Sequence, residues 1–232
     1  MRKELLIFGA EGALGKGVIK VLSQKDFDKI YLFDSKLSDE NIGDKIISIN
    51  VKDLSKEENV IVAFSHIRPE KDCVYFLFST IGGFWGGQSL WETKVEDWDR
   101  MFNVNTKTNF LLAKHFSWLV KSSLGGSICF TAAYTAENPE VMKSAYGASK
   151  AALVHLVKTL ALEGGKINLS VNGISPYIVD TPANRNWMPD ADFNKWVKPE
   201  EIGEVVCSFF NNFTFVSGNI MSLTERFNFL TE

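Results

Sequence analysis

The sequence predicts an α/β fold, a doubly wound parallel sheet with helices on both faces, built as a single domain of residues 1–232. Three observations support this fold. Short apolar runs alternate along the chain with longer segments of helical periodicity. Most of these runs lack polar alternation, which is typical of parallel strands buried on both faces. A glycine-rich turn follows the first apolar run, where a strand would lead into a helix.

The strands are expected at the short apolar runs, in the order Leu5–Phe8, Ile30–Phe33, Ile46–Val51, Val74–Phe78, Ser127–Phe130, Leu169–Ile174 and Ser217–Leu223. The helices are expected between them, at Gly12–Leu22, residues 55–65, Val95–Val120, Ala145–Leu162 and Glu200–Phe210. Ser55 is the expected cap of the second helix, because Glu58 stands three residues on and completes a capping box. The stretch from 177 to 198 shows no regular period, so we expect an irregular loop there.

Composition excludes several classes of function. The chain is 45% apolar, which allows a sizeable core, and its net charge of −3 gives no basic face for nucleic acid. No apolar run approaches the ~20 residues that span a bilayer, and the N-terminus resembles a strand rather than a signal peptide. The three cysteines and three histidines are scattered, so no metal site is predicted. We therefore expect a cytoplasmic protein without a membrane or nucleic-acid partner.

The glycine turn has the pattern of a dinucleotide-binding site. Its expected cofactor-binding residues are Gly9, Glu11, Gly12, Ala13, Leu14 and Gly15. Glycines at this strand–helix junction allow a tight turn and let a pyrophosphate approach the free N–H groups of the helix. The alternative is an ordinary strand–helix turn. In the context of alternating strands and helices, the turn favours a Rossmann-type fold.

Asp34 supports the dinucleotide interpretation. It ends the second expected strand, 19 residues after Gly15, where a carboxylate can accept hydrogen bonds from the adenosine ribose. The same charge would repel the 2′-phosphate of NADP, although Lys36 stands close enough to weaken this effect. NAD(H) is therefore the expected cofactor, in preference to NADP(H). The alternative is that Asp34 only forms a turn with the following serine.

Tyr146 and Lys150 open the alanine-rich helix and share one of its faces, because they are four residues apart. A lysine ammonium beside a tyrosine hydroxyl favours the phenolate and lowers the tyrosine pKa. Such a tyrosine can exchange a proton with a substrate near neutral pH. A tyrosine and a lysine at this spacing are common on exposed helices. The prediction of a catalytic pair therefore depends on their position, just after the fifth strand of a nucleotide-binding α/β chain.

These residues resemble the short-chain dehydrogenase/reductase family over nearly the whole chain. The resemblance implies that Asn105 belongs with Tyr146 and Lys150 in catalysis, as part of a water-linked proton relay. It implies further cofactor contacts, with Val179 and Thr181 near the nicotinamide carboxamide and Lys150 on the ribose. The other contacts that it implies are Asn50, Val51, Thr80, Gly82 and Pro176.

One departure from the family pattern points to the substrate. Where the family has its catalytic serine, thirteen positions before Tyr146, this chain has Ala133. Three segments are similar to the dihydropteridine-reducing branch of the family, which also has alanine there: the glycine turn, Ile81–Gly87 and Asp180–Phe193. This resemblance implies reduction of a quinonoid dihydropteridine to a tetrahydropteridine by NADH, with Tyr146 as proton donor. A conjugated imine does not need a carbonyl polarised by serine.

A flat pterin-like substrate suits aromatic walls, and the candidates for them are Phe84, Trp85, Tyr177 and Trp187, with Ala133 beside them. The last two aromatics lie in or beside the expected substrate loop, about 177–198. The alternative for all four is packing in the core or in a lid. The family also pairs subunits through its long central helix and its tyrosine-bearing helix, which implies a homodimer.

Two other functions remain open from the sequence. The first is a short-chain dehydrogenase/reductase that acts on another carbonyl or unsaturated substrate and has merely inherited these loops. The second is a weakly catalytic NAD(H)-binding protein that senses redox state through a partner. The presence of Tyr146, Lys150 and Asn105 argues against a pure sensor.

Overall fold

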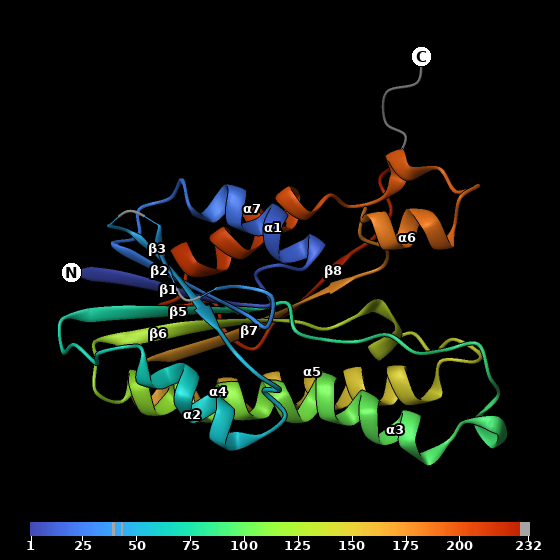
Figure 1. Ribbon diagram of the computed structural model, residues 1–232, viewed down its shortest axis with the longest axis horizontal. Helices are drawn as coiled ribbons and strands as arrows, with labels where there is room; N and C mark the ends of the chain where they lie inside the picture. The colour runs from blue at the N-terminus through green and yellow to red at the C-terminus, as the bar shows by residue number, and fades with distance from the viewer. Residues whose placement is uncertain (39, 43, 228–232) are drawn as a thin grey trace.

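The computed structural model describes residues 1–38, 40–42 and 44–227. In this part of the chain eight strands form one sheet, in the order β3-β4-β2-β1-β5-β6-β7-β8 (Figure 1). Their bounds are β1 Arg2–Phe8, β2 Lys29–Asp34, β3 Glu40–Ile42, β4 Ile46–Asn50, β5 Cys73–Ser79, β6 Gly125–Thr131, β7 Leu169–Pro176 and β8 Ile220–Leu223. All neighbouring strands are parallel except β3, which runs antiparallel to β4. The structure confirms the predicted doubly wound parallel sheet.

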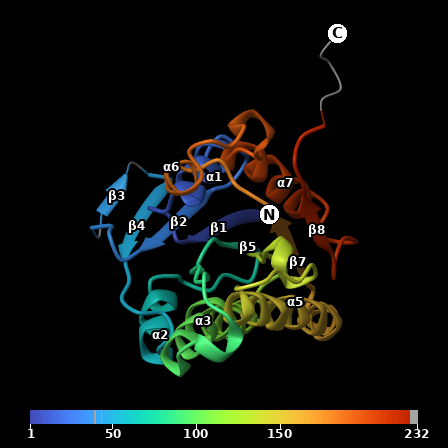
Figure 2. The same ribbon diagram turned by 90° about the vertical axis from the view of Figure 1, so that its right-hand side faces the viewer.

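Helices cover both faces of this sheet. One layer holds α1 (Ala13–Leu22) and α7 (Pro199–Asn211), and the opposite layer holds α2 (Glu57–Ser65), α4 (Thr108–Val120) and α5 (Ser144–Gly164). Figure 2, turned to face the ends of the strands, shows the sheet between the two layers. None of the helices in the described ranges is long and apolar enough to cross a bilayer.

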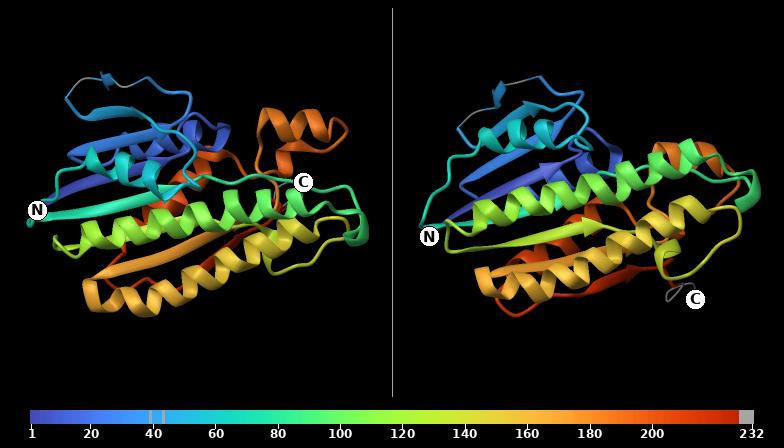
Figure 3. Two further views of the ribbon diagram at one scale, coloured as in Figure 1. Left: turned by 60° about the horizontal axis from the view of Figure 1, so that its bottom comes forward. Right: turned by 90° about the horizontal axis from the view of Figure 1, so that it is seen from below.

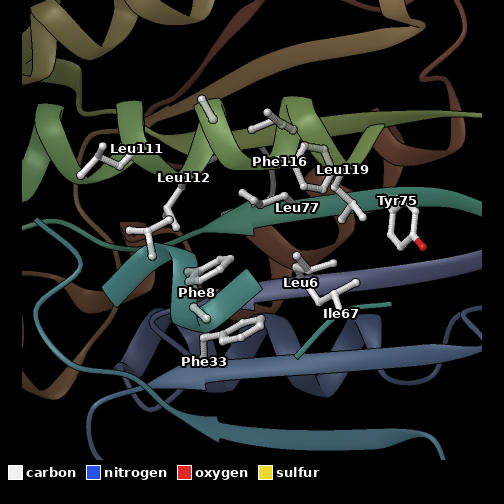
Figure 4. Close-up of a cluster of buried hydrophobic side chains, with 14 of the residues drawn as sticks. Leu6, Phe8, Phe33, Ile67, Tyr75, Leu77, Leu111, Leu112, Phe116 and Leu119 are labelled. Atoms are coloured by element: carbon white, nitrogen blue, oxygen red, sulfur yellow. The ribbon is translucent and has the colours of Figure 1, made fainter. Parts of the chain in front are cut away.

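The strands are apolar because both of their faces are buried. One face packs on α2, α4 and α5 through a core that includes Phe8, Phe33 and Phe116 (Figure 4). The rings of Phe8 and Phe33, on adjacent strands, stack with centroids 4.3 Å apart. The other face packs on α1 and α7 through a second core, in which Val18 and Val206 are fully buried. Two cores on one sheet explain the continuous apolar runs of the sequence.

One local prediction was wrong, and one short strand was missed. Helix α2 begins at Glu57 with Lys56 as its N-cap, so Ser55 does not cap it. The Ser55 hydroxyl instead donates to Asp53 Oδ1 at 2.7 Å, because an aspartate two residues back competes for it. The short edge strand β3 was also not predicted, since three residues carry too little periodicity to be recognised.

The long central helix is not uniform. It comprises α3 (Val95–Phe102), a π-helical segment at Asn103–Lys107, and α4. Figure 3 shows this helix running beside α5 along one side of the molecule. A π-helical turn inside an α-helix is uncommon and is frequent at functional sites. It contains Asn105, which is buried.

The carboxyl ends of the parallel strands meet at one edge of the sheet, where α6 (Pro182–Trp187) and several loops gather (Figure 1). Strand β1 has β2 on one side and β5 on the other, so the chain order reverses at this point. Ligands of open α/β sheets bind outside the carboxyl ends of the strands at such a reversal. The segment from 177 to 198 is irregular as predicted, but it contains α6 and a 3₁₀ turn at Phe193–Lys195.

Candidate active site

The glycine turn has the geometry that close approach of a ligand requires. Gly9 has φ +84°, a backbone conformation that side chains disfavour, and its N–H donates to Phe33 O at 2.9 Å. A Cβ atom added to Gly9 would lie 2.2 Å from Thr80 Oγ1. A Cβ atom on Gly15 would lie 2.2 Å from Gly9 O. Larger side chains at either position would therefore push the turn away from strand β1 and helix α1.

The N-terminus of α1 is open to an anion. Its N-cap is Gly12, which offers no side chain to bind the first N–H groups of the helix. Such uncapped N–H groups and the helix dipole favour a phosphate. Glu11 turns instead to Lys16, with an oxygen–nitrogen distance of 2.7 Å, so its charge is partly neutralised. The turn therefore has the free backbone donors that a pyrophosphate would need.

A cavity of about 730 Å³ lies beside this turn and is lined by Asp34 and Val51. Asp34 Oδ2 accepts the Glu11 N–H at 3.0 Å, and Oδ1 accepts the Lys36 N–H at 3.0 Å. These hydrogen bonds hold the carboxylate at the wall of the cavity, where a ribose could reach it. The cavity has the size and the polar edge that an adenosine would need.

Asn50 does not line this cavity, contrary to the prediction of a cofactor contact. Its amide donates to Ser35 O at 3.1 Å and to Leu37 O at 2.6 Å. It therefore supports the loop after β2, because its side chain leaves β4 toward that loop rather than toward the cavity. The residues after it, Val51, Lys52 and Asp53, line the wall instead.

A second cavity, of about 530 Å³, brings together most of the other predicted site residues. Ile81 lines the first cavity and Gly82 the second, so the two adjoin across this loop. The predicted residues at the second cavity are Leu14, Thr80, Gly82, Phe84, Ala133, Tyr146, Lys150, Pro176, Tyr177, Val179 and Trp187. A dinucleotide that extended from the first cavity would thus place its second half among them.

Lys150 is only 4% exposed, and its Nζ donates to Thr131 O at 2.7 Å. Burial disfavours the charged ammonium and lowers the lysine pKa to about 8. The prediction that Lys150 lowers the pKa of Tyr146 is wrong. Burial and then the charge of Glu140 raise the pKa of Tyr146 to about 12. The ammonium is engaged by a backbone carbonyl, and the phenol remains the protonated, donating form.

Asn105 lies beside Lys150. A Cβ atom on Gly82 would be 2.9 Å from both Asn105 Oδ1 and Lys150 Nζ. The Asn105 amide clamps the neighbouring loop, with Gly83 N–H donating to Oδ1 at 2.8 Å and Nδ2 donating to Gly83 O at 3.0 Å. Nδ2 also donates to Ser149 Oγ at 3.0 Å. The π-helical turn thus places Asn105 between the glycine loop and helix α5.

Phe84 forms the aromatic wall of the second cavity. Its ring lies 5.0 Å from that of Tyr146 and 5.5 Å from that of Trp187, measured between centroids. Trp85 is not among the lining residues, so the prediction that it contacts substrate is not supported by the structure. The loop presents only one of these two adjacent rings to the cavity, and Phe84 is held there by its contacts with Tyr146 and Trp187.

Two other predicted residues lie at the margin of the site. Thr181 lines neither of the two cavities, and its hydroxyl caps α6 by accepting the Asn184 N–H at 3.3 Å. Ala13 lines a separate surface pocket, whose other walls come from α6 and the start of α7. Asn184 itself lines the second cavity and was not predicted.

The sequence reasoning also missed a charged pair in the second cavity. Glu140 Oε1 accepts a hydrogen bond from Lys143 Nζ at 2.7 Å, and Glu140 Oε2 accepts one from the Thr135 hydroxyl. All three side chains line the cavity. These residues stand in a loop without periodicity, and only their closeness to Tyr146 in the chain could have drawn attention to them.

Ala133 is buried and lines the cavity with Tyr146. No lining threonine replaces the missing serine hydroxyl as a donor among the described residues. Thr80 donates to Phe8 O and Gly9 O, Thr131 to Ser79 O, and Thr135 to Glu140. Among the described residues that line the cavity, Tyr146 and Tyr177 carry the hydroxyls that donate no hydrogen bond to the protein, and of these two only Tyr146 stands on the helix of Lys150.

The described residues include no group of three or more histidine, cysteine, aspartate or glutamate side chains that could hold a metal ion. The three cysteines, Cys73, Cys129 and Cys207, are free and buried.

Comparison with known proteins agrees with this geometry. The family model described as short chain dehydrogenase matches residues 3–192. The chain belongs to the short-chain dehydrogenase family. This short-chain dehydrogenase is 30% identical over 215 residues to a dihydropteridine reductase of Dictyostelium discoideum, with 91% of this chain and 89% of that protein covered. It is 26% identical over 230 residues to carbonyl reductase family member 4 of Xenopus laevis, with 95% and 96% covered.

Solved structures resemble this short-chain dehydrogenase in fold. A short chain dehydrogenase family protein of Francisella tularensis superposes with a TM-score of 0.80 at 21% identity, covering 96% of this chain and 97% of that one. The acetoin dehydrogenase of Enterobacter cloacae superposes with a TM-score of 0.81 at 20% identity, covering 96% and 94%. At 20–21% identity this likeness supports the fold only, so the substrate has to be inferred from the residues of the site. Enzymes of the family are NAD(P)(H)-dependent oxidoreductases.

Proposed function

We propose that this short-chain dehydrogenase reduces a quinonoid dihydropteridine to the tetrahydropteridine with NADH. Ala133 carries the proposal, because it removes the hydroxyl that would polarise a ketone, and the lining threonines donate elsewhere. The similarity to the Dictyostelium discoideum dihydropteridine reductase over 91% of the chain supports the same substrate class.

The residues of the first cavity and the glycine turn would hold the cofactor. The uncapped N-terminus of α1 would bind the pyrophosphate, and Asp34 would accept hydrogen bonds from the adenosine ribose. Val179, Pro176 and Thr80 would border the nicotinamide, and Thr181 would need to turn its hydroxyl from α6 to contact it. When bound, NADH supplies the hydride. Asp34 at the ribose is the reason to expect NADH in preference to NADPH.

Tyr146 would supply the proton. Its high pKa keeps the phenol protonated at neutral pH, so it is able to donate to a ring nitrogen of the substrate. Transfer of one hydride and one proton converts the conjugated imine to an amine and leaves a phenolate. Lys150 lies four residues on along the same helix and would stabilise that phenolate once a bound ribose draws its ammonium from Thr131 O. Asn105 would position the lysine and the glycine loop.

The flat ring of a pterin would pack against the aromatic wall. Phe84, Tyr177 and Trp187 line the second cavity, and Phe84 is half exposed. Aromatic faces bind a flat heterocycle through dispersion and desolvation.

The protein would act as a homodimer. Helices α4 and α5 lie side by side on the outside of the molecule (Figure 3), and Phe110, Trp118 and Leu162 are exposed on them. A groove between the two helices is lined by Phe110, Trp118 and Leu160. Exposed apolar surface of this kind marks an interaction site. Sedimentation should show a dimer at micromolar concentration, and Trp118→Glu should give monomers.

The proposed activity is tested by following NADH oxidation with freshly generated quinonoid dihydropterin, beside a series of simple ketones and beside NADPH. The proposal expects turnover with the pterin, much lower turnover with ketones, and a preference for NADH. Ketone turnover without pterin turnover would instead support a carbonyl reductase. Cofactor binding without turnover of any substrate would support a redox sensor.

A further inference from the structure

The feature that the proposed chemistry leaves unused is the carboxylate of Glu140. Among the described residues that line the second cavity, Glu140 alone carries a carboxylate. Its oxygens are held from two sides, by the Thr135 hydroxyl and by Lys143 Nζ at 2.7 Å. A carboxylate offers about four acceptor positions, so two remain free after these hydrogen bonds. The group is therefore fixed in place and still able to bind a ligand.

Glu140 remains ionised at neutral pH. Burial acts to raise its pKa, but the hydrogen bonds from Lys143 and Thr135 outweigh burial and hold the pKa below its usual range. Lys143 partly neutralises this carboxylate through the 2.7 Å ion pair, and its ammonium also lies over the ring of Phe84, 5.8 Å from the centroid. An anionic acceptor thus stands beside the aromatic wall.

The loop that carries Glu140 is built into the site. Met142 has φ +60°, a conformation that residues other than glycine rarely adopt and that often occurs at functional sites. The strained segment is held by the glycine loop, since Gly87 N–H donates to Met142 O at 2.9 Å. A Cβ atom on Gly86 would lie 3.0 Å from the same oxygen. The two loops therefore fix Glu140 and Phe84 relative to one another.

We propose that Glu140 is a specificity-determining residue, which accepts two hydrogen bonds from the 2-amino group and the ring N3–H of a pterin. This inference rests on the proposed function. The pyrimidine edge of a pterin presents two parallel N–H donors, and a carboxylate is the acceptor whose two oxygens match such a pair. Simple ketones carry no such edge, so the carboxylate would be desolvated without compensation when they bind.

The position of Glu140 also couples recognition to the proton donor. Its charge adds to the effect of burial in raising the pKa of Tyr146. Donors that bind Glu140 would spread that charge and make Tyr146 a better acid at the moment when the substrate is in place. The pH profile therefore reports the charge of Glu140 beside Tyr146, and the preference for pterin reports recognition.

The test compares pterin with lumazine, which carries an oxygen in place of the 2-amino group. Binding of each oxidised heterocycle to the complex of the protein with NAD⁺ is measured by fluorescence for the wild type and for Glu140→Gln. The matched control is Glu137→Gln, which removes an exposed carboxylate of the same loop outside the cavity. We expect the wild type and the control to prefer pterin by about 10- to 100-fold and Glu140→Gln to lose that preference.

The pH profile of kcat supplies a second measurement. In Glu140→Gln the limb assigned to Tyr146 should move to lower pH, whereas in Glu137→Gln it should stay in place. Thermal unfolding shows whether Glu140→Gln is folded. If it is not, Glu140→Asp, which keeps the charge but retracts it by one methylene group, must reduce the preference for pterin.

The outcomes separate this inference from the proposed function. Wild-type turnover of quinonoid dihydropterin together with an unchanged preference for pterin in the Glu140 variant would overturn the inference alone. Absence of wild-type turnover would overturn the proposed function, and the inference with it. If the wild type turns over quinonoid dihydropterin, and Glu140→Gln loses the preference for pterin while Glu137→Gln keeps it, both the proposed function and the inference are supported.

Discussion

The ring of Phe84 packs edge-on against that of Tyr146, with the centroids 5.0 Å apart and the planes at 74°. This contact joins the glycine loop after β5 to the first turn of α5, two segments that are distant in the sequence. Half of the Phe84 surface stays exposed, and the residue lines the second cavity. The proposed proton donor and the proposed aromatic wall are therefore in direct contact.

Phe84→Ala should raise KM for quinonoid dihydropterin about tenfold, because the variant removes the apolar surface on which the substrate would pack. We expect kcat to change much less than KM. The adjacent Trp85→Ala is the control, since Trp85 does not line the cavity. Steady-state kinetics of both variants check the prediction, and an equal effect of the two substitutions would contradict it.

Tyr146→Phe should reduce kcat by about 10²- to 10⁴-fold, because it removes the proton donor and keeps the ring. NADH binding, measured by fluorescence titration, should stay unchanged. Tyr134→Phe is a matched control, because the Tyr134 ring packs on Tyr177 and its side chain does not line the cavity. Full turnover by Tyr146→Phe would show that another group or bulk water supplies the proton.

Ala133→Ser should increase kcat/KM for simple ketones by roughly tenfold or more, because it returns a hydroxyl that can stabilise a developing oxyanion. Turnover of quinonoid dihydropterin should change little, since a conjugated imine does not need this hydroxyl. Parallel assays with both substrates measure the ratio. A variant that gains nothing on ketones would mean that the alanine does not explain the substrate preference.

Asp34→Asn should improve the use of NADPH relative to NADH by at least about tenfold, because it removes the carboxylate that would repel a 2′-phosphate. Lys36→Met should act in the opposite direction, since it removes a cation near the same site. KM values for both cofactors, determined in each variant, test the pair. If neither substitution alters the ratio, Asp34 does not select the cofactor.

Lys150→Met should stabilise the protein without cofactor at about pH 7 while it abolishes turnover. The pKa of Lys150 is lowered to about 8 from 10.5, so the folded state holds its proton less tightly than the unfolded state. Stability therefore rises between about pH 8 and about pH 10.5, and below this window the buried charge costs about 3 kcal/mol. Loss of the hydrogen bond to Thr131 O offsets part of this gain.

Urea unfolding at about pH 7 and about pH 10 checks this prediction. The advantage of Lys150→Met over the wild type should shrink as the pH rises, because the wild-type lysine loses its charge. Lys158→Met, on the same helix but more than half exposed, should show no such dependence. A pH-independent difference for Lys150→Met would mean that the lysine is not held at a lowered pKa.

Local patterns predicted much of the site, because the relevant distances are set within one turn or one helix. The glycine turn is an example, since the φ of Gly9 and the contact of Gly15 with Gly9 O are decided within seven residues. Tyr146 and Lys150 are another, because a spacing of four places both on one face of α5. The resemblance to a family added Ala133 and Val179, and the structure brings both to the second cavity.

The predictions that failed depended on contacts with other parts of the chain, which a local sequence pattern does not show. Ser55 was expected to cap a helix, but its hydroxyl donates a hydrogen bond to Asp53 Oδ1 instead. Trp85 and Phe84 are equivalent in the sequence, and only packing against Tyr146 and Trp187 brings Phe84 to the cavity. The pKa of Tyr146 was expected to fall, yet burial and Glu140 raise it.

The sequence by itself determined the alternation of strands and helices, the turn at Gly9, and the helical face shared by Tyr146 and Lys150. Each depends on backbone preference or on periodicity over a few residues. The tertiary structure alone decided that Lys150 meets the carbonyl of Thr131 and that Glu140 stands beside the aromatic wall. Those contacts follow from the order of strands in the sheet and from the docking of two loops. They are therefore properties of the packed chain, and no segment taken alone contains them.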